Sequence, residues 1–323
     1  MVMSKRFAIS ILSFSLALAS LAPAADSRAD EYPQAGWQSG PPADPPVKPQ
    51  GQAPSDEEIR ARAKKLMANQ HSDDDALELY ERVERHIDRT GGIDPRTLED
   101  RTLRIVPTGG GNQKIVLKDE GKSVDPAAYN RQLRNLVDLL GTMADPNNPK
   151  TKAALAKREK RQRERAEFLD AMMDAFLPKW VGSETWNGHA CDVIELNPNP
   201  NFRPRSMFQD ALSHVNAKIW VDHDSNQMAR GEARVTSDIS FGGGILGKLY
   251  RGGIVSMEQA EVAPGVWLPT RYQYDFSGRK FLFAFQQHQV IEVIRYRRVG
   301  RAMEALQIVR NELASGKSFG GDP

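Results

Sequence analysis

The chain has 323 residues, with 44 lysines and arginines against 42 aspartates and glutamates. This length can bury a sizeable core, and the near-neutral charge excludes a general attraction to nucleic acid, whose binding depends on neutralising phosphates. The single cysteine, Cys191, excludes an internal disulfide, so core burial must hold the fold. We expect its thiol to be buried and inert.

The first 24 residues have the three parts of a signal peptide. Lys5 and Arg6 form the positive start, residues 7–21 are apolar, and residues 22–24 are small enough for cleavage. The apolar run is short for a membrane span, and no cysteine follows it to accept an acyl anchor. We therefore expect an exported or secreted, soluble protein without a transmembrane segment after cleavage.

Residues 25–55 are predicted to form a disordered, proline-rich linker. Seven prolines fall between Pro33 and Pro54, and such a segment cannot bury enough apolar surface to offset its ordering entropy. A single domain is expected over 56–300, with a helical insertion at about 126–178. A short helix and a flexible tail are expected at 301–323.

A capping box is predicted at the start of the first helix. The Ser55 side chain can accept a hydrogen bond from a free backbone amide of the first turn, while the Glu58 side chain accepts one from the backbone amide of Ser55. Apolar residues follow at helical spacing, and we expect the helix to close at residues 73–75. From Ala76 to Val124 the pattern is mostly strand-like with glycine breaks, which predicts a hairpin.

Two further helices are predicted after this hairpin. Asp125-Pro126 supplies a capping carboxylate and a proline for the first turn. The second helix runs from about Thr151 to Phe176, and residues 150–165 carry eight lysines and arginines with two glutamates. Anionic lipid head groups are one partner for this basic stretch, but the interleaved glutamates favour a solvated helix.

From Val181 to Val299 the pattern predicts antiparallel strands with short turns, beginning with one strand from Thr185 to Leu196. The later strands offer a large apolar face, whose candidate ligand-cavity residues are Trp220, Trp267, Tyr272, Tyr274, Phe276, Phe281, Phe283 and Phe285. Two roles are open for this face. It either packs as ordinary core against the helices, or lines a cavity between a curved sheet and the helices that cover it.

Residues 241–253, FGGGILGKLYRGG, match most of the phosphate-binding pattern G-x-x-x-x-G-K. A phosphate loop also needs a hydroxyl after the lysine and a helix after the loop. Leu249 lacks the hydroxyl, and further glycines arrive too soon for a helix, so we expect a sharp backbone turn. Its apolar residues are candidates for a gate or rim of the cavity: Ile245, Leu246, Leu249 and Tyr250.

The sequence also lacks complete local motifs for metal binding or nucleophilic catalysis. Residues 222–226 begin like a calcium loop, but Gln227 stands where glycine is needed and Ala233 where a carboxylate is needed. The six histidines show no metal-ligand spacing, and there is no G-x-S-x-G elbow. We expect no metal, no cofactor and no catalysis, while an enzyme with a dispersed site stays open because it would leave no local motif.

Several short segments occur in an order that resembles the outer-membrane lipoprotein-sorting (LolA/LolB-like) superfamily, particularly its uncharacterised exported members. The segments are Trp186–Leu196, Lys218–Asp222, Met257–Gln259, Val266–Arg271 and Tyr296–Arg298. The likeness covers residues 180–300 well and 76–125 weakly. It implies an α+β fold, with a curved antiparallel β half-barrel covered by helices and an apolar cavity that receives acyl chains of lipoproteins or related lipids.

Two hypotheses of function follow from the residues and the resemblance. The leading one is a soluble periplasmic lipid-binding or lipoprotein-carrier-like protein that is not catalytic, and a peripheral membrane contact is compatible with it. The alternative is an envelope protein-binding sensor or scaffold, which the resemblance also implies. It would use the 25–55 linker for reach and the basic helix for its partner.

Overall fold

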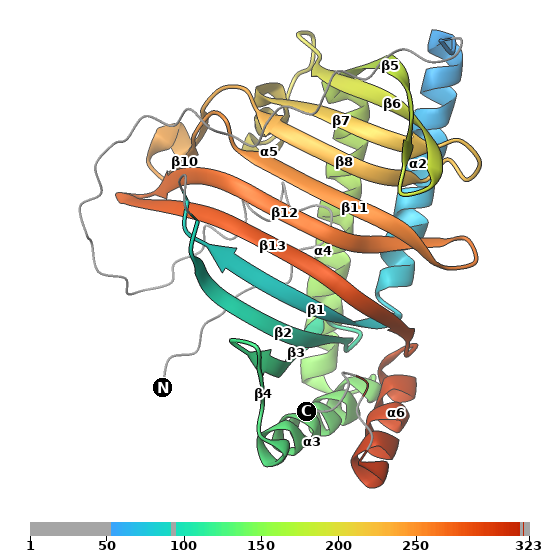
Figure 1. Cartoon of the computed structure of the whole chain (residues 1–323), viewed down its shortest axis with the longest axis vertical. Coiled ribbons are helices and arrows are strands. Elements are labelled where there is room, and N and C mark those ends of the chain that lie inside the picture. The colour runs from blue at the N-terminus through green and yellow to red at the C-terminus, as the bar shows by residue number, and fades with distance from the viewer. Residues whose placement is uncertain (1–52, 92–94, 317–318, 320–323) are drawn as a thin grey trace.

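The computed structural model describes residues 53–91, 95–316 and 319, so the predicted signal peptide and most of the predicted linker lie outside the described residues. An antiparallel sheet forms the centre of the molecule (Figure 1). Its strands are β1 (Tyr80–Arg89), β2 (Thr97–Pro107), β3 (Asn112–Asp119), β4 (Lys122–Ser123), β5 (Phe176–Trp186), β6 (His189–Pro198), β7 (Val215–Asp222), β8 (Met228–Val235), β9 (Ile239–Phe241), β10 (Gly247–Leu249), β11 (Ile254–Ala263), β12 (Val266–Lys280) and β13 (Phe283–Arg298).

The strands pair in the order β4-β3-β2-β1-β13-β12-β11-β8-β7-β6-β5, while β10 pairs with β12 and β9. The sheet is therefore open, with β4 and β5 at its edges. It joins strands from both ends of the chain, because β1 lies beside β13. The strands before and after the predicted helical insertion thus belong to one sheet.

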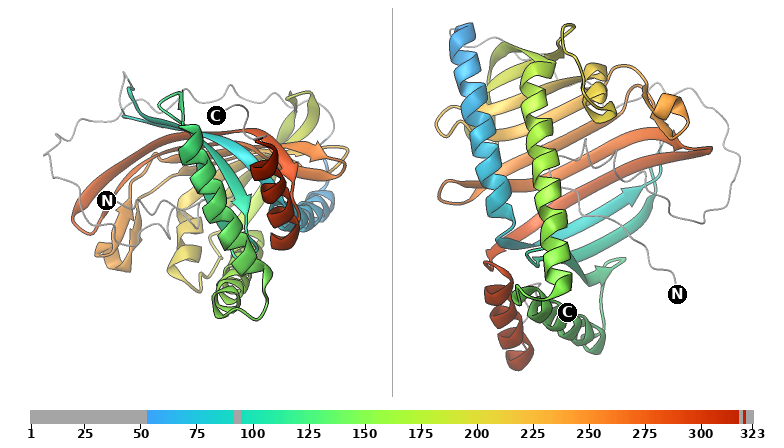
Figure 2. Two further views of the ribbon diagram at one scale, coloured as in Figure 1. Left: turned by 90° about the horizontal axis from the view of Figure 1, so that it is seen from below. Right: turned by 180° about the vertical axis from the view of Figure 1, so that it is seen from behind.

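The helices are α2 (Asp56–Leu77), α3 (Pro126–Ala144), α4 (Pro149–Ala175), α5 (Met207–Asp210), η1 (Ala211–His214), η2 (Gly242–Gly244) and α6 (Ala302–Ser315). The sheet is arched, and α2 and α4 cross one of its faces, which we call the inner face (Figure 2). The α3 and α6 helices pack together at the β1–β3 end. The predicted α+β class, a curved antiparallel sheet covered by helices, is confirmed.

The helix starts follow the predicted caps. Ser55 and Glu58 form a capping box, Asp125 accepts from the amide of Ala128, and Asn148 accepts from that of Lys150. The predicted end of the first helix at residues 73–75 is wrong, since α2 continues to Leu77. Asp73 and Asp74 have partners within the fold, described below, and do not break the helix.

The prediction of one strand from Thr185 to Leu196 is also wrong. The segment is a hairpin, in which Asn187 and Gly188 form the turn between β5 and β6 with φ of 48° and 87°. Asn-Gly is the pair that suits two consecutive positive φ angles in a tight hairpin. The signal was therefore present in the sequence and was missed.

Residues alternate between the two faces of the sheet, and each face has its own core. On the inner face, Tyr272, Tyr274 and Phe276 of β12 pack with Ile291 of β13 and other apolar residues. On the other face, Val83 of β1 packs with apolar residues of α3 and α6. Both faces of β1 are consequently buried over part of its length.

Candidate functional site

The predicted cavity residues of β12 lie side by side on the inner face, where their rings pack on one another. Tyr272 and Tyr274 are stacked with centroids 6.3 Å apart, and Tyr274 and Phe276 meet edge to face at 6.5 Å. Phe285 of β13, half-buried, packs edge to face on Phe276 at 6.2 Å. Because these rings fill the space beside each other, they form a wall of the core.

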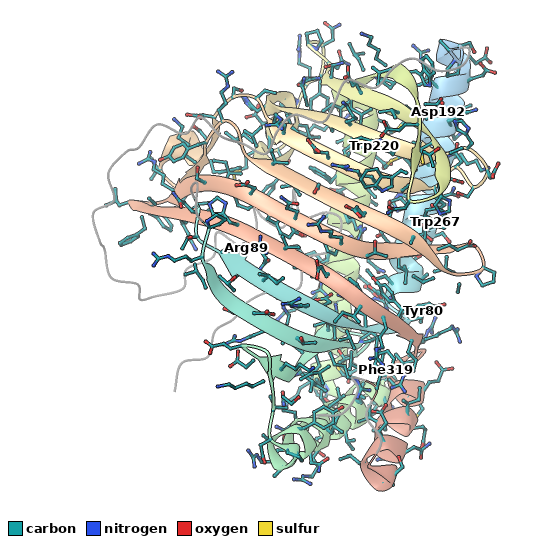
Figure 3. All side chains as sticks on the ribbon, in the orientation of Figure 1. Tyr80, Arg89, Asp192, Trp220, Trp267 and Phe319 are labelled. Carbon is teal, nitrogen blue, oxygen red and sulfur yellow. The ribbon has the colours of Figure 1, made fainter. Side chains whose placement is uncertain are left out.

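Trp220 and Trp267 belong to a different cluster, together with Cys191, Val193 and Ala229. Both tryptophans lie toward the opposite ends of the strands from the 241–253 turn (Figure 3). Trp220 is buried, and the guanidinium of Arg230 lies 4.7 Å from its ring. The structure therefore does not bring Trp220 and Trp267 together with the β12 aromatics.

Cys191 lies in this tryptophan cluster with no exposed surface, and burial raises the pKa of its thiol to about 12. The predicted buried thiol is confirmed. We expect a disulfide reagent to leave the native protein unmodified at pH 8 and to modify one thiol per chain in denaturant, because the thiolate is the reacting form. An Ala190→Cys variant, whose new thiol is on an exposed neighbour, should react in the native state; reaction of native Cys191 at that same rate would contradict the assignment.

Phe281 and Phe283 are exposed at the turn between β12 and β13. Phe281 has a positive φ of 51° and lies outside both strands, so it does not continue the alternation expected for Phe281, Phe283 and Phe285. The turn lies beside the gate residues, because the amide of Phe281 donates to the carbonyl of Leu246 at 3.2 Å. We call the exposed residues here the apolar tip: Ile245, Leu246, Tyr250, Phe281, Leu282 and Phe283.

The fourth predicted gate residue, Leu249, is not part of this tip. It is buried in the inner-face core with Phe241 and Phe276. The 241–253 turn is therefore anchored by Leu249, while Ile245, Leu246 and Tyr250 point to solvent.

The inner face also carries a strip of small side chains that sequence reasoning did not identify. Ala217 of β7 pairs with Ala233 of β8, and Gly231 is the next β8 residue on the same face. All three are half-buried. The strip lies between larger residues, since Ala217 also pairs with Leu196 of β6 and Ala233 with Val255 of β11. We call Ala217, Gly231 and Ala233 the small-residue lane.

The two helices over the inner face are joined to each other by charged side chains. Arg165 of α4 pairs with Asp74 of α2, and Arg158 of α4 pairs with Glu78. Asp73 of α2 accepts the backbone N–H of Trp267 at 3.0 Å. Burial raises the pKa of Asp73 and that of Asp74 to about 6. The helix seam therefore contains buried charges that are costly to desolvate.

Farther along the inner face the residues become charged. Arg82, Glu84 and His86 of β1 face this side, because His86 pairs with Ile291, which in turn pairs with Tyr272. Arg82 Nε donates to Glu84 Oε1 at 2.5 Å, and His86 Nε2 lies 2.6 Å from Glu84 Oε2. The inner face thus passes from apolar on β6–β12 to charged on β1.

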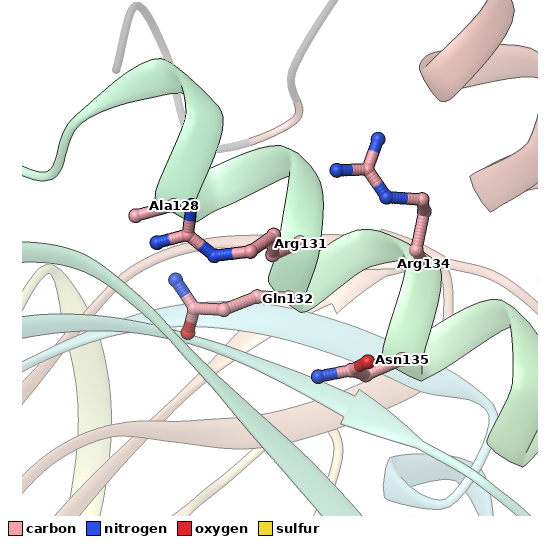
Figure 4. A pocket seen from close by; sticks show the side chains of 5 residues that line it. All are labelled: Ala128, Arg131, Gln132, Arg134 and Asn135. Atoms are coloured by element: carbon pink, nitrogen blue, oxygen red, sulfur yellow. The ribbon is translucent and has the colours of Figure 1, made fainter.

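A separate hollow of about 350 Å³ lies on α3 and is open to solvent (Figure 4). It is lined by Ala128, Arg131, Gln132, Arg134 and Asn135. None of the predicted site residues lies in it. The Gln132 side chain already has partners, since it accepts from the backbone N–H of Val116 and donates to the Val116 carbonyl.

Within residues 53–91, 95–316 and 319, no group of three His, Cys, Asp or Glu side chains is arranged to hold a metal ion. In the same part of the chain, none of the helices is both long and apolar enough to cross a membrane.

No protein-family model matches the chain, and no curated protein matches it. Among solved structures, it is similar to a Vibrio parahaemolyticus domain assigned to outer-membrane lipoprotein sorting, with 10% identity, a TM-score of 0.30, and coverage of 73% of this chain and 92% of that one. A DUF1329 family protein from Desulfovibrio piger has 12% identity and a TM-score of 0.28, covering 74% and 92%.

A LolA superfamily protein from Nitrosomonas europaea has 9% identity and a TM-score of 0.27, covering 73% and 92%. This similarity assigns no ligand to the chain.

Proposed function

We propose that this protein is a non-catalytic lipid-binding protein, exported to the periplasm, that holds an acyl chain on the inner face of its sheet. The small-residue lane carries the proposal. Ala217 and Ala233 place small, partly exposed side chains at the centre of an otherwise large-sided apolar face, so an acyl chain can lie closer to the backbone there than elsewhere on the face. Gly231 is covered, because a Cβ on it would lie 3.1 Å from the sulfur of Met228, and this flexible side chain has to move before an acyl chain reaches Gly231.

The chemistry of the face suits an acyl chain. Leu196, Ile219 and Val255 are half-buried apolar residues beside the lane, so a hydrocarbon laid there is removed from water on one side by the sheet. Each methylene that is buried contributes about 0.8 kcal/mol.

The covering helices also support binding. The contacts between α2 and α4 named above are ion pairs, and exposing such groups to water restores their hydration. Separating the two helices therefore costs less than separating an apolar seam of equal size. A guest enters the lane when the seam between α2 and α4 opens.

Filling the lane is expected to block binding. An Ala233→Leu substitution places a larger side chain where the acyl chain lies, and we expect about a four- to fifteenfold weaker affinity for a fluorescent fatty acid, as displacement of one to two methylenes from their site implies. The measurement is a fluorescence titration, together with lipid extraction and mass spectrometry of natively purified protein.

Arg234→Leu is the control, because Arg234 is the next residue to Ala233 on a regular part of β8, so its partly exposed side chain lies on the opposite face of the sheet. Equal affinity of both variants and the parent would contradict the lane as the site. Absence of any bound lipid or probe would contradict lipid binding itself and leave the protein-binding sensor or scaffold as the function to test by crosslinking.

A further inference from the structure

The apolar tip exposes large hydrophobic side chains where two turns of the chain meet. Leu282 is 88% exposed, Ile245 75% and Phe283 64%. Six of the twelve exposed large hydrophobics among the described residues belong to the tip. Single exposed apolar residues are ordinary, but a contiguous group of them marks a binding surface.

The two turns of the tip are held together by backbone contacts. β10 pairs with the end of β12, from Gly247 opposite Lys280 to Leu249 opposite Gly278. Gly278 has to be glycine, because a Cβ there would lie 2.3 Å from the carbonyl oxygen of Lys248. Arg279 donates to the carbonyl of Gly244 at 3.1 Å. The tip is therefore a defined protrusion, visible at the end of β12 and β13 in Figure 1.

The core beneath the tip is complete without the exposed side chains. Leu249 and Phe276 are buried there and Phe285 is half-buried against them. The rings of Phe281 and Phe283 instead point to solvent, as does Leu282. Packing thus gives no reason for these residues to be apolar.

Basic side chains surround the tip. Lys248, Arg251, Arg279 and Lys280 lie within a few residues of it, against one carboxylate, Asp238, which pairs with Lys248 at 2.8 Å. Arg89, at the same end of the neighbouring β1, adds a further exposed guanidinium (Figure 3), while Asp88 beside it is a second carboxylate and accepts from the Gln289 side chain. The positive charge complements an anionic partner.

We propose that the apolar tip docks this protein onto the surface of an anionic lipid bilayer. The tip inserts Ile245, Leu282 and Phe283 into the boundary between head groups and acyl chains, while the basic side chains contact lipid phosphates. A bilayer fits this tip better than a protein groove does, because apolar residues at the apex and cations at the flanks match the layering of a membrane. The docking uses other residues than the small-residue lane, so it holds whether or not the lane binds an acyl chain.

Vesicle binding tests this proposal with the mature full chain. We expect it to sediment with vesicles of phosphatidylcholine and phosphatidylglycerol, more weakly with phosphatidylcholine alone, and less as salt is raised. A Leu282→Ser/Phe283→Ser double variant should bind at least about tenfold more weakly, since it removes two insertable side chains. Ile294→Ser is the matched control, because Ile294 lies on the same strand β13, is 55% exposed, and is away from the tip.

A fluorescent probe on the tip gives an independent readout. Leu282→Cys and Ile294→Cys can each be labelled with an environment-sensitive dye, because the native Cys191 is buried. Vesicles should shift the emission of the dye at residue 282 to the blue and leave that at residue 294 unchanged.

Equal vesicle binding by the double tip variant and the parent would overturn the proposal, as would an equal loss in Ile294→Ser. Failure of the parent to bind any vesicle would also overturn it. If the parent then forms a concentration-dependent dimer that the double variant does not form, the tip is instead a contact between copies of the chain. Circular dichroism melting of each variant confirms that these exposed substitutions leave the fold intact.

Discussion

Replacing Arg104 by methionine is expected to lower the free energy of unfolding by about 3–5 kcal/mol, because it removes a fully buried cation from between two carboxylates. Arg104 Nε donates to Glu81 Oε2 at 2.8 Å, and its Nη1 donates to Glu312 Oε2 at 2.7 Å. Arg297 contacts both carboxylates as well, but it is partly exposed. The variant leaves one cation for two buried carboxylates, and urea denaturation followed by circular dichroism measures the loss.

Arg101→Met is the control for this prediction. Arg101 lies on the same strand, and its partner Asp119 is exposed, so the loss should be within about 1 kcal/mol. A similar small loss for Arg104→Met would show that the buried network does not contribute beyond an ordinary surface pair. The network joins β1, β2 and α6, and the ring of Phe319 lies 4.3 Å from the Arg297 guanidinium; the variant should therefore also loosen the end of the chain.

This arginine shows where prediction from sequence reached its limit. Leu103 and Ile105 alternate with Arg104, which indicates a strand, and a strand is present there. The alternation gives no sign that Arg104 is buried, yet its side chain has no exposed surface. Alternation identifies a strand but does not reveal that helices far along the chain, α3 and α6, cover its polar side.

The candidate site was predictable to a similar extent. Period-two alternation correctly placed Tyr272, Tyr274 and Phe276 on one buried face, because β12 is regular there. Phe281 departs from this parity because the chain turns at that residue with a positive φ. The lane was missed because alanine and glycine carry no distinctive pattern, and only strand register brings Ala217 beside Ala233.

The protein is expected to be more stable near pH 5 than near pH 8, and Asp73→Asn should remove much of this difference. Burial raises the pKa of Asp73 to about 6 from an ordinary value of 3.8. A carboxyl with a raised pKa in the folded state favours folding at pH values below the unfolded pKa, and this contribution is lost as pH rises through 6. At 1.36 kcal/mol per pKa unit the full effect, from below pH 3.8 to above pH 6, is about 3 kcal/mol, and about 1.4 kcal/mol of it falls between pH 5 and pH 8.

Asparagine has no charge to bury and can still accept the N–H of Trp267, so Asp73→Asn should stabilise the protein at pH 8 and change little at pH 4. Urea denaturation at several pH values measures both effects. Asp75→Asn removes an equal charge from an exposed position on the same helix and should leave the pH dependence unchanged. Some dependence should persist in Asp73→Asn because burial also raises the pKa of Asp74.

An unchanged difference between pH 5 and pH 8 in Asp73→Asn would contradict the assignment of this titration to Asp73. If the assignment holds, the contact between α2 and the start of β12 weakens as pH rises through about 6, since ionised Asp73 then lies buried beside ionised Asp74. Because α2 is one of the two helices over the small-residue lane, affinity for a fatty-acid probe should change across the same pH interval in the parent. The change in affinity should be smaller in Asp73→Asn. Such a result would show that the stability of the α2 contact controls access to the small-residue lane.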